Sequence, residues 1–94
     1  MEHLFNKLIE KLTLDDIEVL NTLTSKESFN RFSALPKQEV LKNTNLTESL
    51  FRKSVSRLEA MHFIVVTNGS RGHVLFVTDY GQEAITNIYE RSNA

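Results

Sequence analysis

The chain has 94 residues, of which 40% are hydrophobic and 24% charged, with a formal net charge of −1 and no cysteine. This length predicts one domain, and the lack of cysteine excludes disulfides and thiolate metal sites. No apolar run reaches the length of a membrane-spanning helix, and charges interrupt the apolar N-terminal segment, unlike in a signal peptide. We therefore expect a cytoplasmic protein without a membrane partner.

The charges are distributed unevenly along the chain. Residues 1–24 carry two basic and five acidic side chains, and residues 78–94 carry one basic and three acidic side chains. Residues 36–57 reverse this balance, with five basic and two acidic side chains. A basic patch on a near-neutral protein is typical of a phosphate-binding face. Ordinary solvated lysines and arginines give the same count, so the charges alone do not decide.

The N-terminal segment predicts an amphipathic helix over residues 1–12. Its apolar stripe has helical spacing and consists of Leu4, Phe5, Leu8, Ile9 and Leu12. Such a stripe either folds back on its own core or packs against the same helix of a second subunit. We expect the second arrangement, because the rest of the chain can supply a small core.

A second helix is expected over residues 13–25, with Thr13 as its cap and two aspartates in its first turn. Its predicted buried face consists of Leu14, Ile17, Val19, Leu20 and Leu23. The following connection is polar, and we expect Phe29 and Phe32 to plug the core from it.

Residues 36–43 and 47–61 predict two helices separated by a tight turn, which together form a helix-turn-helix. Pro36 suits the first position of the shorter helix, and Thr47 can cap the longer one. One face of the longer helix is apolar, with Leu46, Phe51, Val55 and Leu58 at helical spacing. Its other face carries hydroxyl and cationic side chains, which suit base edges and phosphates.

Residues 64–78 predict a two-stranded ribbon, because two β-prone segments flank a glycine-containing turn. Arg71 lies near the tip of this ribbon. Thr78 caps a last helix over residues 79–90, whose apolar stripe consists of Tyr80, Ala84, Ile85, Ile88 and Tyr89. The predicted fold class is therefore α+β, with a helical core, a two- to three-stranded β-wing and an added N-terminal helix.

The element order and four short motifs resemble a MarR-like winged helix-turn-helix domain. The resemblance spans residues 35–85 and rests on Leu35–Leu41, on Leu46-Thr47 with Ser56–Glu59, on Phe63-Ile64 and on Val77–Gly81. Asn45 and His62 stand where the family prefers glycine, and both can adopt the left-handed conformation. The chain lacks the length in which larger family members build a ligand pocket, so small-molecule sensing is not expected.

The resemblance implies that the helix over residues 47–61 enters the major groove of double-stranded DNA. We predict base contacts from Thr47, Ser49, Leu50 and Lys53, and phosphate contacts from Lys37, Lys42, Arg52 and Arg57, with Ser56 on the same face and Arg71 in or beside the minor groove. A core position for Leu50 and an internal salt bridge for Arg57 are the alternatives.

The protein is expected to be a homodimer that pairs through its terminal helices, at Leu4, Phe5, Leu8, Ile9, Leu12, Ile85, Ile88 and Tyr89. No glycine-rich phosphate loop is present, and the three histidines lie in different predicted elements. We therefore predict neither an enzyme nor a metal or cofactor site.

Three functions fit this reading of the sequence. A small homodimeric transcriptional regulator comes first, and a plasmid centromere-binding or replication adaptor of the same fold comes second. A protein–protein interaction module is the third, since winged helices also serve in that role.

Overall fold

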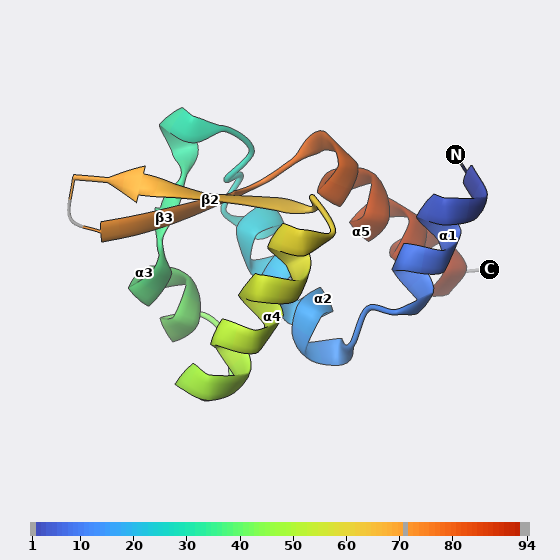
Figure 1. The fold of residues 1–94 in the computed structure, drawn as a ribbon, viewed down its shortest axis with the longest axis horizontal. Coiled ribbons are helices and arrows are strands. Elements are labelled where there is room, and N and C mark those ends of the chain that lie inside the picture. Colours follow the sequence, from blue (N-terminus) through green and yellow to red (C-terminus); the bar gives the residue numbers. More distant parts are fainter. Residues whose placement is uncertain (1, 71, 93–94) are drawn as a thin grey trace.

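A computed structural model describes residues 2–70 and 72–92 of the chain (Figure 1). Its elements are α1 (Glu2–Glu10), α2 (Leu14–Ser25), the 3₁₀-helix η1 (Arg31–Ser33), β1 (Leu35–Pro36), α3 (Lys37–Lys42), α4 (Glu48–Ala60), β2 (Ile64–Gly69), β3 (Gly72–Val77) and α5 (Asp79–Ser92). The observed order confirms the predicted winged helix-turn-helix with an added N-terminal helix.

The three strands form one antiparallel sheet in the order β1-β3-β2. The hairpin register runs from Ile64 opposite Val77 to Gly69 opposite Gly72, so two residues separate the strands. Figure 1 shows this hairpin projecting at one end of the molecule, with α1, α5 and both chain ends at the other. The wing and the terminal helices are therefore free to contact different partners.

The core lies between the helices and the sheet, with α2 packed against α4, α5 and β3. Its largest fully buried side chains include Leu20, Leu23, Leu58 and Phe63. Phe63 also contacts an aromatic pair, with its ring centroid 6.4 Å from that of Phe5 and 5.1 Å from that of Tyr80. This contact joins α1 to the end of the helix-turn-helix unit.

Helix α1 packs on the core of its own chain, so our expectation that its stripe is kept for a second subunit is wrong in part. Ile9 is buried in the core, as is Ile85 of α5, and both are therefore covered without a partner. Phe5, Leu8 and Leu12 are partly buried against the same core. The small core supplied by the other helices still has an open side, and α1 covers it.

Two predicted core residues are exposed. Leu14 is 83% exposed. The buried stripe of α2 consists of Asp16, Val19, Leu20 and Leu23. Leu14 is rotated by about 200° from Asp16 around the helix axis and therefore lies on the opposite face. Phe32 is 100% exposed, since the Asn30 side chain accepts hydrogen bonds from Phe32 N and Ser33 N and folds η1 outward. Phe29, by contrast, packs against the core as predicted.

The backbone differs from expectation at Pro36 and Asn45 and agrees with it at His62. Pro36 ends β1 opposite Val74 rather than starting α3, which suits a residue without an N–H on an edge strand. His62 adopts the left-handed conformation with a φ of 64°, as predicted. Among the described non-glycine residues Glu27 shares this conformation, with a φ of 56°, and Asn45 does not.

Candidate nucleic-acid interface

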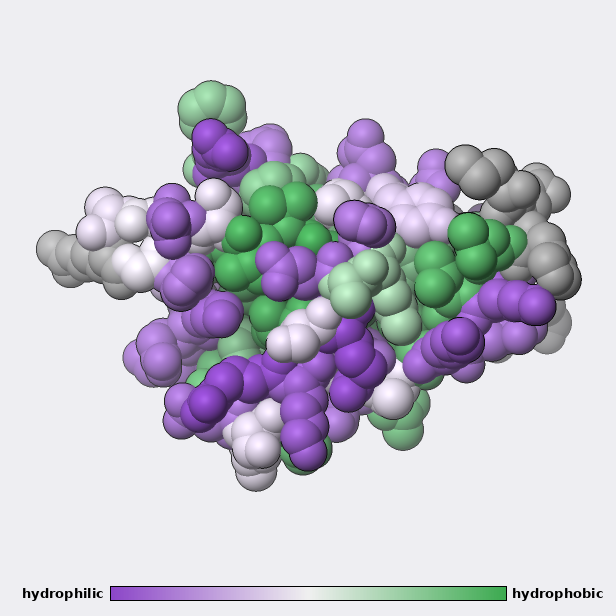
Figure 2. Space-filling view, in the orientation of Figure 1, coloured by the Kyte–Doolittle hydropathy of each residue, from purple (hydrophilic) through white to green (hydrophobic). Residues whose placement is uncertain are grey.

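The solvent-facing side of α4 gathers the side chains predicted to contact DNA. Phe51, Ser54, Val55 and Leu58 form the buried stripe of the helix. The candidates Thr47, Ser49, Leu50, Arg52, Lys53 and Ser56 are all exposed. Figure 2 shows hydrophilic residues gathered over α3 and α4. The helix therefore presents a polar, cationic surface opposite its core stripe.

The start of α4 is fixed by its cap, as predicted. The Thr47 hydroxyl oxygen accepts a hydrogen bond from Leu50 N at 3.3 Å, and its own hydrogen remains able to donate to a ligand. Leu50 is 42% exposed, so the alternative of a core position is wrong. Its side chain is free to meet an apolar group such as a thymine methyl.

Arg52 forms an ion pair with Glu48, one helical turn earlier, with 3.2 Å between Nη2 and Oε1. Both side chains are largely exposed, and such a pair contributes only about 0.3–0.5 kcal/mol. A phosphate can therefore compete for the guanidinium. Glu48 also places a negative charge on the proposed DNA-binding face.

The two lysines of α3 lie at its opposite ends. Lys37 is half-buried in the first turn, and Lys42 is exposed in the last turn, directly before the turn that leads into α4. Arg71 lies outside the described residues, so its predicted minor-groove contact stays a prediction.

The Arg57 side chain does not point to the solvent side of α4. It forms the internal salt bridge that was the alternative prediction, and its partner is Asp16. Its Nη2 lies 2.8 Å from Oδ1 of Asp16, and its Nε lies 3.2 Å from both carboxylate oxygens. The same Nη2 donates to Ser54 Oγ at 3.2 Å and to Thr13 Oγ1 at 3.4 Å. The Asp16 side chain is fully buried, and that of Arg57 is 38% exposed. The predicted phosphate contact of Arg57 is therefore wrong in this arrangement.

The environment of Asp16 keeps this pair ionised. Burial raises the pKa of the carboxyl, but hydrogen bonds from Arg57 and Thr13 together with the Arg57 charge lower it more, so the net pKa is below the ordinary value. The hydrogen bond to Asp16 correspondingly raises the pKa of Arg57. At neutral pH the pair is therefore a charged carboxylate–guanidinium contact between α2 and α4.

A second carboxylate of α2 contacts the turn of the helix-turn-helix. Glu18 Oε1 accepts a hydrogen bond from Asn45 N at 2.7 Å. The sequence predicts neither pairing: it allows an internal salt bridge for Arg57 without naming its partner, and it indicates only a helix start at Asp16. Its place on the stripe of Val19, Leu20 and Leu23 is the signal for Asp16, because a charge on a buried face requires a partner.

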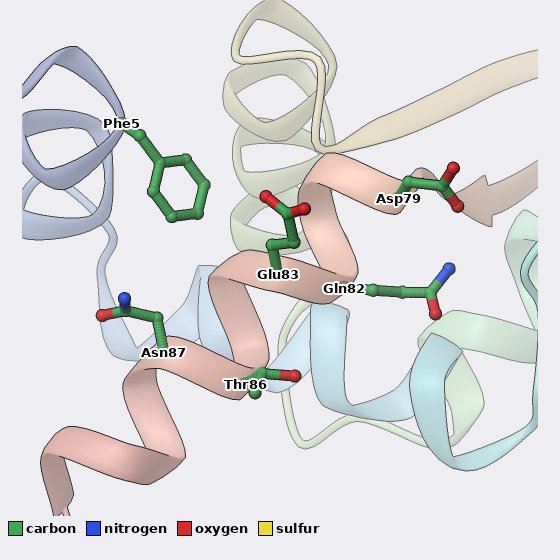
Figure 3. Close-up of a pocket in the computed structure, with 6 residues that line it drawn as sticks. All are labelled: Phe5, Asp79, Gln82, Glu83, Thr86 and Asn87. Atoms are coloured by element: carbon green, nitrogen blue, oxygen red, sulfur yellow. The ribbon is translucent and has the colours of Figure 1, made fainter. Parts of the chain in front are cut away.

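A hollow of about 540 Å³ lies between α1 and α5, far along the molecule from the wing (Figure 3). It is lined by Phe5, Asp79, Gln82, Glu83, Thr86 and Asn87. Among the described residues two carboxylates and no cation line it, so this lining does not suit a phosphate group.

The described residues contain no group of three or more histidine, aspartate or glutamate side chains placed to hold a metal ion. No helix in the described ranges is long and apolar enough to span a membrane.

Comparison with known proteins places the chain in a family. No protein-family model matches it. It is 34% identical over 85 residues to "DNA-binding protein TubR" of Priestia megaterium, a match that covers 90% of this chain and 84% of that protein. The structure of TubR from Bacillus megaterium pBM400 superposes with a TM-score of 0.87 at 32% identity, over 93% of this chain and 97% of that one. A MarR family transcription regulator superposes with a TM-score of 0.74 at 13% identity, over 96% of this chain and 59% of that one, which confirms the fold. The chain is a winged-helix protein and belongs to the TubR family.

Proposed function

We propose that this protein binds double-stranded DNA in a sequence-specific manner, as a homodimer, with α4 in the major groove and no catalytic activity. The observation that carries the proposal is the exposed face of α4, where Ser49, Arg52 and Lys53 lie opposite the core stripe. A side chain on this face can reach base edges or phosphates without disturbing the core. The DNA-binding name of the TubR relative supports the same function. The proposed location of this chain is the cytoplasm.

Two cellular roles fit such a protein. The first is a transcriptional regulator that binds a palindrome in a promoter. The second is a plasmid centromere-binding or replication adaptor, a role that the winged-helix fold can fill with little added to it. The chain covers 97% of TubR and 59% of the MarR family regulator, so the likeness to TubR is the fuller one. Arrayed repeats beside a gene for a filament-forming NTPase would support the second role.

Single substitutions separate base readers from phosphate contacts. Ser49→Ala and Lys53→Ala should relax discrimination at particular base pairs by about 1–3 kcal/mol each, because both side chains project from the exposed face of α4. Lys42→Ala should instead weaken binding to all duplexes equally and reduce the salt slope by about one unit for each subunit of the dimer. The measurement is affinity for a duplex enriched from a random pool and for its single-base variants.

The same variants carry their own control, since surface substitutions should change the free energy of unfolding by less than about 0.5 kcal/mol. If Lys53→Ala keeps its specificity while Lys42→Ala loses it at one base pair, α4 is the wrong helix for the groove.

The proposed dimer pairs the terminal helices through their remaining apolar surface. Leu4 and Tyr89 are largely exposed, and Phe5, Leu8, Leu12 and Ile88 are only partly covered. Sedimentation at micromolar concentration should return a dimer, and Leu4→Lys should shift it toward monomer because a charge there must be desolvated. Glu10→Lys, on the exposed side of α1, is the matched control and should leave the dimer intact. A wild-type monomer would contradict the proposal.

A further inference from the structure

Two carboxylates of helix α2 bind on either side of α4, one in the last turn of α4 and one in the turn that precedes it. Asp16 binds Arg57 in the last turn of α4, and Glu18 binds the backbone of Asn45 in the turn that precedes α4. The two carboxylates lie two residues apart on α2, and their targets lie twelve residues apart. Helix α2 is therefore hydrogen-bonded both to the last turn of α4 and to the turn before it.

The contact with Arg57 restricts rotation as well as distance. The guanidinium is planar, and its Nε and Nη2 both donate to the Asp16 carboxylate, at 3.2 Å and 2.8 Å. Such a two-point hydrogen bond has a preferred plane, unlike a single point charge. Because Asp16 is fully buried on the core stripe of α2, it cannot follow a rotation of α4 about its own axis.

The contact with Asn45 fixes where α4 begins. Glu18 accepts the Asn45 N–H at 2.7 Å, which is within the range of a strong, charge-assisted hydrogen bond. The helix itself does not depend on this bond, since Thr47 caps it and Phe51, Val55 and Leu58 anchor its buried side. What the bond adds is a defined position of the turn relative to α2.

We propose that Asp16 and Glu18 are positioning residues that set the orientation of α4 for base readout. The inference rests on the proposed DNA-binding function. Neither residue needs to touch DNA, and both act through the placement of side chains such as Lys53. Base readout depends on placement to within about 0.5 Å, whereas phosphate attraction tolerates a looser arrangement. Loss of the two contacts should therefore reduce specificity more than general affinity.

Glu18 allows a test without a folding defect, because its hydrogen bond lies at the surface. Glu18→Ala should lower the ratio of affinities for an enriched duplex and a scrambled duplex by about threefold to tenfold. Glu18→Gln keeps an acceptor oxygen and should stay within about twofold of wild type. Glu10→Gln removes one negative charge from the exposed side of α1 and should change nothing. A loss with Glu18→Gln equal to that with Glu18→Ala would show a charge effect and overturn the proposal.

The double variant Asp16→Leu with Arg57→Met tests the buried contact. Replacing a buried ion pair with apolar residues of similar volume often leaves stability unchanged. We expect a folded protein with an unchanged salt slope on the scrambled duplex and a lower affinity ratio, although loss of the Asp16 bond to Thr13 N costs some stability. A folded double variant with the wild-type ratio would overturn the role of Asp16. A salt slope reduced by about one unit for each subunit would show that Arg57 itself binds a phosphate, which would also overturn it.

The wild-type protein separates this proposal from the one on which it rests. If wild type does not bind either duplex, the proposed function fails. If wild type binds selectively and the Glu18→Ala and double variants match it, only the positioning role fails. If the double variant does not fold, the series of Glu18 variants still decides.

Discussion

Replacing Phe51 with alanine is expected to lower the free energy of unfolding by about 3–5 kcal/mol. Phe51 begins the buried stripe of α4 and belongs to the central core cluster together with Val55 and Leu58. Removing its ring leaves a cavity that the surrounding helices and sheet can fill only in part. Urea unfolding followed by circular dichroism measures the loss, and the variant should be unfolded or nearly so at 37 °C.

The neighbouring residue on the same helix is the matched control. Leu50 loses the same kind of apolar surface on truncation, but it is exposed, so Leu50→Ala should change the free energy of unfolding by less than about 0.5 kcal/mol. If the variant changes anything, it should be DNA binding. Equal destabilisation by the two substitutions would mean that α4 is rotated from the orientation described above.

Replacing Gly81 with alanine is expected to destabilise the fold by about 3 kcal/mol, at the upper end of the range for overpacked sites. A methyl group on Gly81 would overlap the carbonyl oxygen of Phe63 and would lie 2.6 Å from Cγ2 of Val77. The Phe63 carbonyl cannot easily move, because it accepts hydrogen bonds from the backbone and hydroxyl of Thr78 at 3.0 and 3.1 Å. Thermal unfolding should show a melting temperature lower by several degrees.

Gln82→Ala provides the control for Gly81, since it adds no atoms and lies beside Gly81 in the first turns of α5. It should leave the melting temperature near that of wild type. A Gly81→Ala variant as stable as Gln82→Ala would contradict the close approach of α5 to the start of β2. This approach also explains physically why the motif Val77–Gly81 ends in glycine.

Periodic patterns predicted most elements of the fold. The stripes of α2, α4 and α5 and the β-prone ribbon are local features, and each was visible without knowledge of its neighbours. Caps at Thr13, Thr47 and Thr78 were predicted for the same reason, and all three accept the expected backbone N–H. Local chemistry between residues three or four apart is readable from a sequence.

Contacts between distant residues were not readable in this way. The pairing of Asp16 with Arg57 spans 41 residues. A sequence does not show that α2 and α4 lie close together at Asp16, nor which arginine forms the ion pair. The exposure of Phe32 likewise depends on how a polar turn folds, not on hydrophobicity. For the candidate site, the exposed residues of α4 were predicted because they lie opposite an apolar stripe, whereas Arg57 lies at the edge of that stripe.

The dependence of DNA affinity on salt is the most direct test of the central claim. Lys37, Lys42, Arg52 and Lys53 lie on or beside the proposed face, and each phosphate contact contributes a slope of about −0.9 in log affinity against log salt concentration. A dimer with three or four such contacts per subunit should therefore show a slope of about −5 to −7 on a duplex of mixed sequence. A flat response, or no binding at 50 mM salt, would contradict DNA binding and favour a protein–protein interaction module.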